Sequence, residues 1–265
     1  MRTKKRLGQH FLVNRGVVDH ILDSLELVPG EPILEIGPGP GTLTFPLHER
    51  GFASTVVEVD QDMVAHLRSH PCQPPLRIIC ADFMTLSLDE VVLSGTKVVS
   101  NLPYNLSVPI TARLLERADA IPLMVMMYQR EVAERIRASP GTKDYGPISV
   151  LVQSQYAIDR HFNVKPGSFR PPPKVDSQVI RLRRLNRPLI EISALPRLTE
   201  LLRFIFTYRR KTLGRILKGW QGNWTNREAL LESLAECGVA SNSRPESLAI
   251  EDFVAWFRKI GPKDD

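Results

Sequence analysis

The sequence has little cysteine and no long apolar run. Its three cysteines, Cys72, Cys80 and Cys237, include no Cys-x-x-Cys pair, so neither a disulfide framework nor a zinc site is predicted. No run of 18 or more apolar residues occurs, and the basic amino terminus lacks the apolar stretch of a secretory signal. We therefore expect a cytoplasmic protein without membrane-spanning helices. A composition of 43% hydrophobic and 24% charged residues is typical of one or two globular domains.

Acidic residues are scarce in one part of the chain. Between residues 160 and 218 there are fifteen Lys or Arg residues and three acids, although the net charge of the whole chain is only +6. Such a one-sided excess of positive charge indicates a polyanionic partner. The alternative is a solvated basic surface that binds nothing.

Short apolar runs rich in β-branched residues alternate with helical patterns over the first two-thirds of the chain. Strands are expected at 32–36, 55–59, 76–80, 97–100, 123–127, 162–164 and 177–182, and helices at 14–27, 43–50, 61–69, 109–117 and 130–138. This alternation predicts an α/β fold with a doubly wound, mostly parallel sheet. The alternating pattern of 177–182 favours an antiparallel strand, whereas periodicity leaves 148–156 open between helix and strand.

The pattern changes after residue 187. Segments 195–205, 211–218, 227–237 and 250–260 have helical spacing with few strand signals, and Gly238 stands where a helix C-cap is expected. We predict two domains: an α/β domain over residues 1–187 and a smaller all-helical domain over residues 188–265.

The first expected strand runs into a glycine-rich turn, EIGPGPG, which contains Glu35, Gly37 and Gly39. Glycines let a backbone turn sharply and let a ligand approach main-chain atoms. A dinucleotide-binding G-x-G-x-x-G pattern would need a glycine where Thr42 stands. The spacing instead suits a nucleoside ligand without a pyrophosphate, and a plain glycine-rich turn is the alternative.

The next two strands end in acidic residues. Glu58 can accept hydrogen bonds from both hydroxyls of a ribose, as acids do at this place in doubly wound folds. Asp82 can accept from an exocyclic amine, and Phe83 can cover a purine. Each acid alone could equally be a helix N-cap.

The fourth strand ends in Asn101-Leu102-Pro103-Tyr104. Asn-x-Pro could serve only to turn the chain. However, ligand-type residues end four successive strands, and the carboxyl ends of parallel strands are where such folds bind ligands. The four together therefore favour a binding site over four separate caps and turns.

These residues resemble the class I S-adenosylmethionine-dependent methyltransferases that act on adenine N6. Further segments, residues 8–12 (GQHFL), Tyr145-Gly146, 169–177 (FRPPPKVDS), 209–212 (RRKT) and 244–248 (RPESL), resemble the small-subunit ribosomal RNA adenine N6,N6-dimethyltransferases of the kasugamycin-sensitivity (KsgA/RsmA) type. The similarity runs from about residue 5 to 258, and the FRPPPKVDS string is its most specific part. The resemblance implies dimethylation of two adjacent adenines near the 3′ end of 16S RNA during ribosome maturation.

The resemblance also implies a cofactor and a set of site residues. The cofactor is S-adenosyl-L-methionine, and no metal is expected. The cofactor-binding residues would be His10, Leu12, Gly37, Gly39, Glu58, Asp82 and Asn101. The catalytic residues would be Asn101, Leu102, Pro103, Tyr104 and Phe169, and the RNA-binding residues Arg170, Lys174, Arg209, Arg210 and Lys211.

An aromatic amine is a poor nucleophile because its lone pair is delocalised into the ring. The Asn101 side-chain oxygen and the Leu102 carbonyl can accept from the amine, and Pro103 can aim them because it fixes φ. Tyr104 and Phe169 would stack on the two faces of a base taken out of its stack. For Phe169 the alternative is a core aromatic that anchors the triple-proline turn.

Two other functions stay open. An erythromycin-resistance type enzyme would methylate large-subunit RNA with a related pocket, although the FRPPPKVDS and RPESL segments favour the small subunit. A mainly non-catalytic ribosome assembly factor would keep the RNA surface without the reaction, but the intact glycine turn, Glu58, Asp82 and Asn101 argue for catalysis. We expect a monomer that acts on small-subunit RNA within a 30S precursor, away from membranes.

Overall fold

The computed structural model describes residues 10–260, which form two compact units. The first comprises residues 10–133 and Ala157–Arg184, and the second comprises Glu134–Tyr156 and residues 185–260. Gly8 and Gln9 of the GQHFL segment lie outside the described residues. Within residues 10–260, no helix has both the length and the apolar character needed to cross a membrane.

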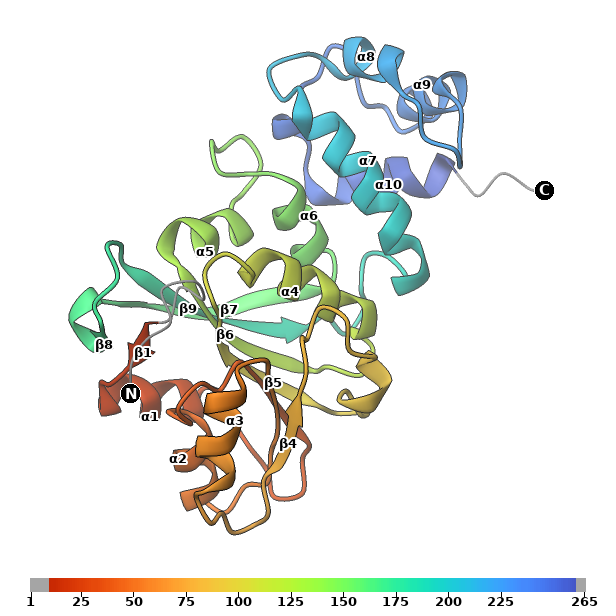
Figure 1. Ribbon diagram of the computed structural model, residues 1–265. Helices are drawn as coiled ribbons and strands as arrows, with labels where there is room; N and C mark the ends of the chain where they lie inside the picture. The colour runs from red at the N-terminus through yellow and green to blue at the C-terminus, as the bar shows by residue number, and fades with distance from the viewer. Residues whose placement is uncertain (1–9, 261–265) are drawn as a thin grey trace. The chain divides into compact units, whose positions relative to one another are not determined.

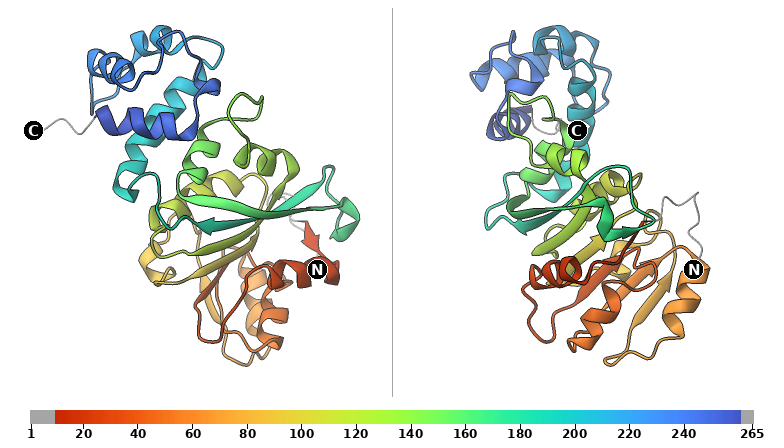
Figure 2. Two further views of the ribbon diagram at one scale, coloured as in Figure 1. Left: turned by 180° about the vertical axis from the view of Figure 1, so that it is seen from behind. Right: turned by 90° about the vertical axis from the view of Figure 1, so that its left-hand side faces the viewer.

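A seven-stranded sheet forms the centre of the first unit (Figures 1 and 2). Its strands are β2 (Ile33–Ile36), β3 (Thr55–Glu58), β4 (Arg77–Cys80), β5 (Lys97–Asn101), β6 (Leu123–Gln129), β7 (Tyr156–Val164) and β9 (Ser177–Arg184). The strand order is β4-β3-β2-β5-β6-β9-β7. Strands β4 to β6 in this order pair in parallel, and β9 runs antiparallel to β6. The predicted doubly wound, mostly parallel sheet is confirmed.

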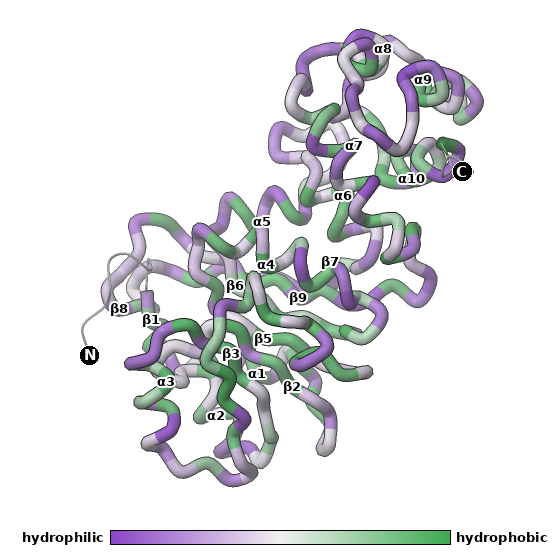
Figure 3. Tube along the Cα trace, turned by 45° about the vertical axis from the view of Figure 1, so that its right-hand side comes forward, coloured by the Kyte–Doolittle hydropathy of each residue, from purple (hydrophilic) through white to green (hydrophobic). Residues whose placement is uncertain are grey.

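The inner strands β2, β5 and β6 are buried at all or all but one of their positions. Strand β2 is buried at all four positions, and β6 at six of its seven positions. Figure 3 shows the hydrophobic residues concentrated along these strands. A strand whose two faces are both covered by helices needs a continuous apolar run. The apolar runs of the sequence therefore form the inner strands of the sheet.

Helices flank the sheet of the first unit. They are α1 (Arg15–Asp23), α2 (Thr44–Glu49), α3 (Gln61–Arg68) and α4 (Ser107–Leu114), and α5 (Arg130–Ile136) runs on into the second unit. Asn14 caps α1 by accepting from the N–H of Val17, and Asp60 caps α3 by accepting from the N–H of Asp62. Helix α1 is shorter than the expected 14–27. It ends at Asp23, and Leu25 packs into the core from the segment that follows.

The second unit is helical. Its helices are α6 (Pro147–Gln153), α7 (Leu195–Thr207), α8 (Leu213–Ile216), α9 (Arg227–Glu236) and α10 (Ile250–Ile260). Segment 148–156, which periodicity left open, is helix α6 followed by the start of β7. Trp256 is fully buried and donates its ring N–H to the Leu230 carbonyl at 3.2 Å, which joins α10 to α9. Gly238 follows α9 with φ of 69°, as expected of a C-cap.

Segment Glu134–Tyr156 belongs to the second unit together with residues 185–260. This segment lies within the predicted first domain, residues 1–187, but its apolar helix α6 contacts α7 and α10. The end of the first unit at Arg184 lies close to the expected boundary at residue 187. The division into functional domains at that boundary stays a prediction.

An ion-pair cluster joins β9, β7 and the segment after α1. Arg181, whose side chain is 5% exposed, pairs with Glu26 at 2.5 Å and with Asp159 at 2.7 Å. Arg183, whose side chain is 43% exposed, pairs with the same two acids. Partial burial opposes ionisation of Asp159, but hydrogen bonds from both arginines outweigh it and lower its pKa to about 2. Two positive charges of the basic stretch are therefore neutralised inside the fold.

Replacement of Arg181 by Met should lower the free energy of unfolding by about 1–3 kcal/mol, since two partly shielded acids lose a buried partner. The matched change Arg183→Met, on the same strand and against the same acids, should cost less than about 1 kcal/mol because that side chain is exposed. Urea unfolding at pH 7 measures both values.

The same cluster gives a pH dependence. A carboxyl with a lowered pKa stabilises the fold above its unfolded pKa, and this contribution disappears as the pH falls through the folded pKa. The stability of the wild type should therefore fall between about pH 4 and pH 2, and Arg181→Met should flatten this slope. Equal costs for the two variants, with an unchanged slope, would contradict the assignment.

Candidate active site at the carboxyl edge of the sheet

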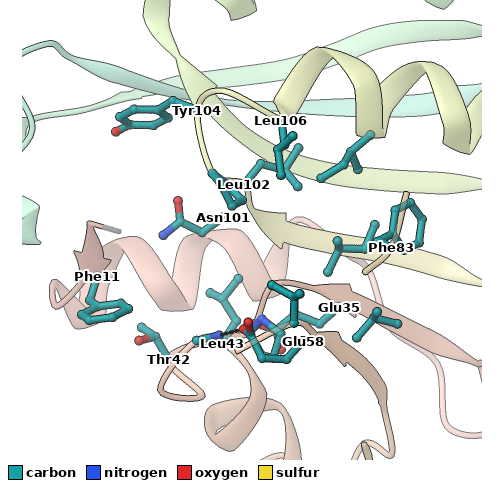
Figure 4. A pocket seen from close by; sticks show the side chains of 18 of the residues that line it. Phe11, Glu35, Thr42, Leu43, Glu58, Phe83, Asn101, Leu102, Tyr104 and Leu106 are labelled. Atoms are coloured by element: carbon teal, nitrogen blue, oxygen red, sulfur yellow. Dashed lines mark hydrogen bonds between the residues drawn. The ribbon is translucent and has the colours of Figure 1, made fainter. Parts of the chain in front are cut away.

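One pocket opens at the carboxyl ends of β2, β3, β4 and β5. Residues from all four strand ends line it, together with residues 10–12 of the amino-terminal segment. Of the predicted site residues, the lining includes His10, Leu12, Gly37, Gly39, Glu58, Asp82, Asn101, Leu102, Pro103 and Tyr104. Figure 4 shows the Asn101 amide between the rings of Tyr104 and Phe11 in this view. The sheet thus brings together residues that span almost one hundred positions of the chain.

The glycine turn after β2, called the glycine floor below, contributes Gly37 and Gly39 to the pocket lining, and Gly41 lies in the same turn. Gly37, Gly39 and Gly41 have φ values of 66°, 55° and 84°, in the left-handed region that favours glycine. A Cβ on Gly39 would lie 3.3 Å from the Phe11 ring, and one on Gly41 would lie 2.5 Å from the Phe45 ring. Side chains here would therefore fill the floor or displace a neighbouring ring.

Glu58 is buried at the end of β3. One carboxylate oxygen accepts from the N–H of Gly39 at 3.0 Å, and the other accepts from the N–H of Asp60 at 2.9 Å. Two main-chain donors therefore orient the carboxylate toward the pocket. Each carboxylate oxygen has a second lone pair with which to accept from a ligand hydroxyl.

Glu35 lies beside Glu58 and carries a raised pKa. Burial raises the pKa of Glu35 to about 8, against a hydrogen bond from the Thr44 hydroxyl at 2.6 Å and with a smaller contribution from the Glu58 charge. Burial therefore favours the protonated, uncharged form of Glu35 at neutral pH.

Asp82 and Phe83 follow β4. Asp82 is exposed and accepts from the N–H of Met84 at 2.9 Å, so it closes a turn and does not cap a helix. Phe83 is buried and lines the pocket. The pair offers an acceptor and an apolar ring at the same side of the opening.

Asn101 ends β5, and its amide is oriented by the amino-terminal segment. The side-chain N–H of Asn101 donates to the His10 carbonyl at 3.4 Å. With its amino group directed to this carbonyl, the amide oxygen is free to face the pocket. Leu102 follows in the pocket lining with its side chain buried.

Tyr104 contacts two groups that lie far away in sequence. Its ring stacks on His10 with centroids 5.7 Å apart, and its hydroxyl is 2.8 Å from the Ser177 hydroxyl. Burial raises the pKa of the Tyr104 phenol, partly offset by the bond to Ser177. Ser177 was not identified as a site residue from the sequence, although it ends the FRPPPKVDS string.

Phe169, which was predicted to stack on the target base, lies in the hydrophobic core. It lies in β8 (Phe169–Arg170), which pairs antiparallel with β1 (Phe11–Leu12), and its side chain is 2% exposed within the hydrophobic core. A ring buried to this extent offers no face to a base, so this arrangement argues against the stacking role. It fits the alternative of a core aromatic that anchors the turn.

The same segment holds His10 over the pocket. The His10 ring nitrogen Nδ1 donates to the Pro171 carbonyl at 2.8 Å. A neutral His10 with its proton on Nδ1 has only an acceptor at its other ring nitrogen. The contact with Pro171 thus fixes the orientation of the His10 ring at the edge of the pocket.

The predicted RNA-binding residues divide into exposed cations and one paired arginine. Arg170 and Lys174 of the first unit are exposed, as are Arg210 and Lys211 of the second. Arg209 instead pairs with Glu246 at 2.9 Å and donates to the Lys143 carbonyl at 2.7 Å. Carboxylate and carbonyl groups of its own unit thus occupy Arg209, and its role in RNA binding stays a prediction.

Comparison with known proteins gives one family and several similar chains. The model of the family described as "Ribosomal RNA adenine dimethylase" matches residues 1–260. A protein of Alcanivorax borkumensis named "Ribosomal RNA small subunit methyltransferase A" is 40% identical over 269 residues, which cover 100% of this chain and 92% of that protein.

Two solved structures share the fold. The crystal structure of a dimethyladenosine transferase from Plasmodium falciparum matches with a TM-score of 0.78 at 24% identity, over 96% of this chain and 99% of that chain. The crystal structure of the 23S rRNA methyltransferase ErmE matches with a TM-score of 0.64 at 27% identity, over 94% and 99%.

The glycine floor can be tested with a matched pair of substitutions. Gly41→Ala and Gly51→Ala both place a side chain at a positive φ, which costs about 1–2 kcal/mol, but a Cβ on Gly51 meets nothing within 4 Å. Because its Cβ also collides with Phe45, Gly41→Ala should lose more unfolding free energy than Gly51→Ala in urea titrations. It should also weaken S-adenosylmethionine binding in calorimetry, which Gly51→Ala should leave intact. Identical behaviour of the two variants would show that the turn tolerates a side chain.

Proposed function

The chain belongs to the ribosomal RNA adenine dimethylase family, and we propose that it dimethylates N6 of two adjacent adenines near the 3′ end of 16S ribosomal RNA. As a member of this family it is an S-adenosylmethionine-dependent adenine dimethyltransferase. The small-subunit target is supported by the full-length relative at 40% identity, whose name specifies the small subunit. The observation that carries the proposal is the position of Asn101-Leu102-Pro103-Tyr104 in the same pocket as the glycine turn and Glu58.

The residues of the pocket fit the cofactor. A Cβ on Gly39 would crowd the Phe11 ring at 3.3 Å, so glycine keeps this side of the pocket open, and Glu58 keeps acceptor capacity beyond its two main-chain donors. We assign the ribose hydroxyls to Glu58, the adenine amine to Asp82 and the methionine portion to the side near His10 and Gly37. When bound, the cofactor supplies an electrophilic methyl group on a sulfonium.

The protein's own groups would prepare the amine. The Asn101 oxygen and the Leu102 carbonyl would accept hydrogen bonds from the N–H groups of the amine. These bonds favour rotation of the amine out of conjugation with the ring, which concentrates the lone pair on nitrogen. Pro103 fixes the backbone angle between them. No strong general base is needed, because catalysis rests on alignment and fixed dipoles and the nitrogen releases one proton to water after methyl transfer, when it is cationic and acidic. A monomethylated amine still has one N–H for these acceptors, so the same site can act twice.

The substrate base would leave its stack and pack against the Tyr104 ring. Exposed Arg170 and Lys174 on the first unit and Arg210 and Lys211 on the second would contact phosphates, which position the RNA without reading its bases. We infer that the enzyme acts as a monomer in the cytoplasm on a 30S precursor.

A second candidate is methylation of large-subunit RNA. It is favoured by the similarity to ErmE over 94% of this chain. The identity to ErmE is 27%, against 40% to the small-subunit relative, so the small-subunit target is preferred. A mainly non-catalytic assembly factor is disfavoured because residues of the glycine turn, Glu58 and Asn101 line one pocket. Methylation of purified 30S particles and of 23S RNA in parallel separates the two targets.

Replacement of Asn101 by Ala should lower kcat for methylation of 30S particles by about 10²- to 10³-fold, as loss of one preorganised polar contact does. The cofactor still has the glycine turn and Glu58, so its affinity should change much less. Asn186→Ala, an exposed position outside the pocket, is the control and should keep wild-type rates. Single-turnover transfer of labelled methyl groups measures the effect, and a wild-type rate for Asn101→Ala would contradict the mechanism.

Neighbouring arginines should behave differently in RNA binding. Arg210→Ala should weaken binding and lower the slope of log affinity against log salt by roughly one, without a change in stability. Arg209→Ala should instead lower the thermal unfolding temperature, because Glu246 and two carbonyls lose their donor. Filter binding at several salt concentrations and thermal unfolding test the pair. Equal salt slopes and unchanged stability for both variants would contradict this division.

A further inference from the structure

The Tyr104 side chain is fixed at both its ring and its hydroxyl. The ring faces His10, and the hydroxyl is 2.8 Å from the Ser177 hydroxyl. Among the described residues, Ser177 is the hydrogen-bond partner of this phenol. The contact joins the pocket loop after β5 to the first residue of β9, 73 positions further along the chain.

Ser177 is itself held firmly. It is fully buried, and it pairs with Gln129 at the end of the antiparallel β6–β9 ladder. The preceding carbonyl of Asp176 accepts from the N–H of Arg130 at 2.9 Å, and the Asp176 carboxylate pairs with Lys165 at 2.9 Å. The Ser177 hydroxyl is therefore a fixed point of the sheet, whereas Tyr104 lies in a loop.

The hydroxyl of Tyr104 restricts the motion of the ring only if it is bonded to a fixed partner. A phenylalanine would offer the same flat surface to a base, but it would be free to change rotamer in the loop. A phenol bonded to a fixed hydroxyl loses that freedom before the substrate arrives. The loss of side-chain entropy therefore does not weaken substrate binding.

We propose that Ser177 is a positioning residue for methyl transfer, whose hydroxyl holds the Tyr104 ring where the target adenine stacks. The proposal rests on the proposed function, since it assumes that Tyr104 receives the base. It assigns a role to the last residue of the FRPPPKVDS string. That string reaches the site through Ser177 and the Pro171 carbonyl, while Phe169 remains in the core.

A double-mutant cycle tests the proposal. Ser177→Ala, Tyr104→Phe and the combined variant are compared with wild type for kcat, for KM toward 30S particles and for cofactor affinity. Each single change should lower kcat roughly 5- to 10-fold, the effect of one lost hydrogen bond. Cofactor affinity should stay within about twofold, since the bond does not face the glycine floor. The combined variant should be no slower than the single variants, because both remove the same bond.

Controls separate positioning from folding. Ser24→Ala removes another buried serine hydroxyl of the same unit, one that donates to the His20 carbonyl at 2.7 Å, and it should leave kcat unchanged. Unfolding temperatures of all variants are measured in parallel. Multiplicative losses of kcat in the combined variant, or a loss explained by unfolding alone, would overturn the proposal. A wild type inactive on 30S particles would instead overturn the proposed target, because the cycle is measured only on active enzyme.

Discussion

The carboxyl ends of four parallel strands meet along one edge of the sheet, and the site depends on this geometry. Strand β2 pairs with β3 on one side and with β5 on the other, so the strand order reverses beside the glycine turn. At this switch point the connecting loops diverge and leave an opening. Glu58 and Asn101 therefore lie on opposite sides of the same turn, one suited to hold a nucleoside and the other to receive an amine. The strand order therefore brings the residues that follow these strands to the same edge of the sheet, whichever side chains they carry.

Strand β9 and the residues before it contact two residues that line the pocket, His10 and Tyr104. Its pairing with β6 ends at Ser177, and the preceding residues pair with the amino-terminal segment as β8 and β1. Three contacts result: the Pro171 carbonyl with His10, the His10 carbonyl with Asn101, and the Ser177 hydroxyl with Tyr104. Segments from the start, middle and later part of the first unit are thus joined above the pocket. This explains physically why a proline-rich string remote from the glycine turn belongs to the same site.

Sequence patterns predicted the sheet, most helices and the pocket residues, because apolar runs and strand-end polar residues are local signals. Side-chain pairing was not predictable in the same way. Phe169 looked like a base-stacking ring, but only the β1–β8 pairing shows that it points into the core. Arg209 and Arg181 belong to the basic stretch 160–218, yet each pairs with acids outside that stretch or far along the chain, Glu246 for the first and Asp159 and Glu26 for the second. Ser177 carried no signal of its own, since its partner lies 73 residues away.

The central claim is that this sheet edge presents the amine of an adenine to a methyl donor twice in succession. The most direct test is to treat undermethylated 30S particles with the enzyme and isotopically labelled S-adenosylmethionine, and then to digest the 16S RNA and identify the labelled nucleosides by mass spectrometry. We expect labelled N6,N6-dimethyladenosine at two adjacent positions near the 3′ end. Label confined to another base, or present in 23S RNA and absent from 16S RNA, would contradict it.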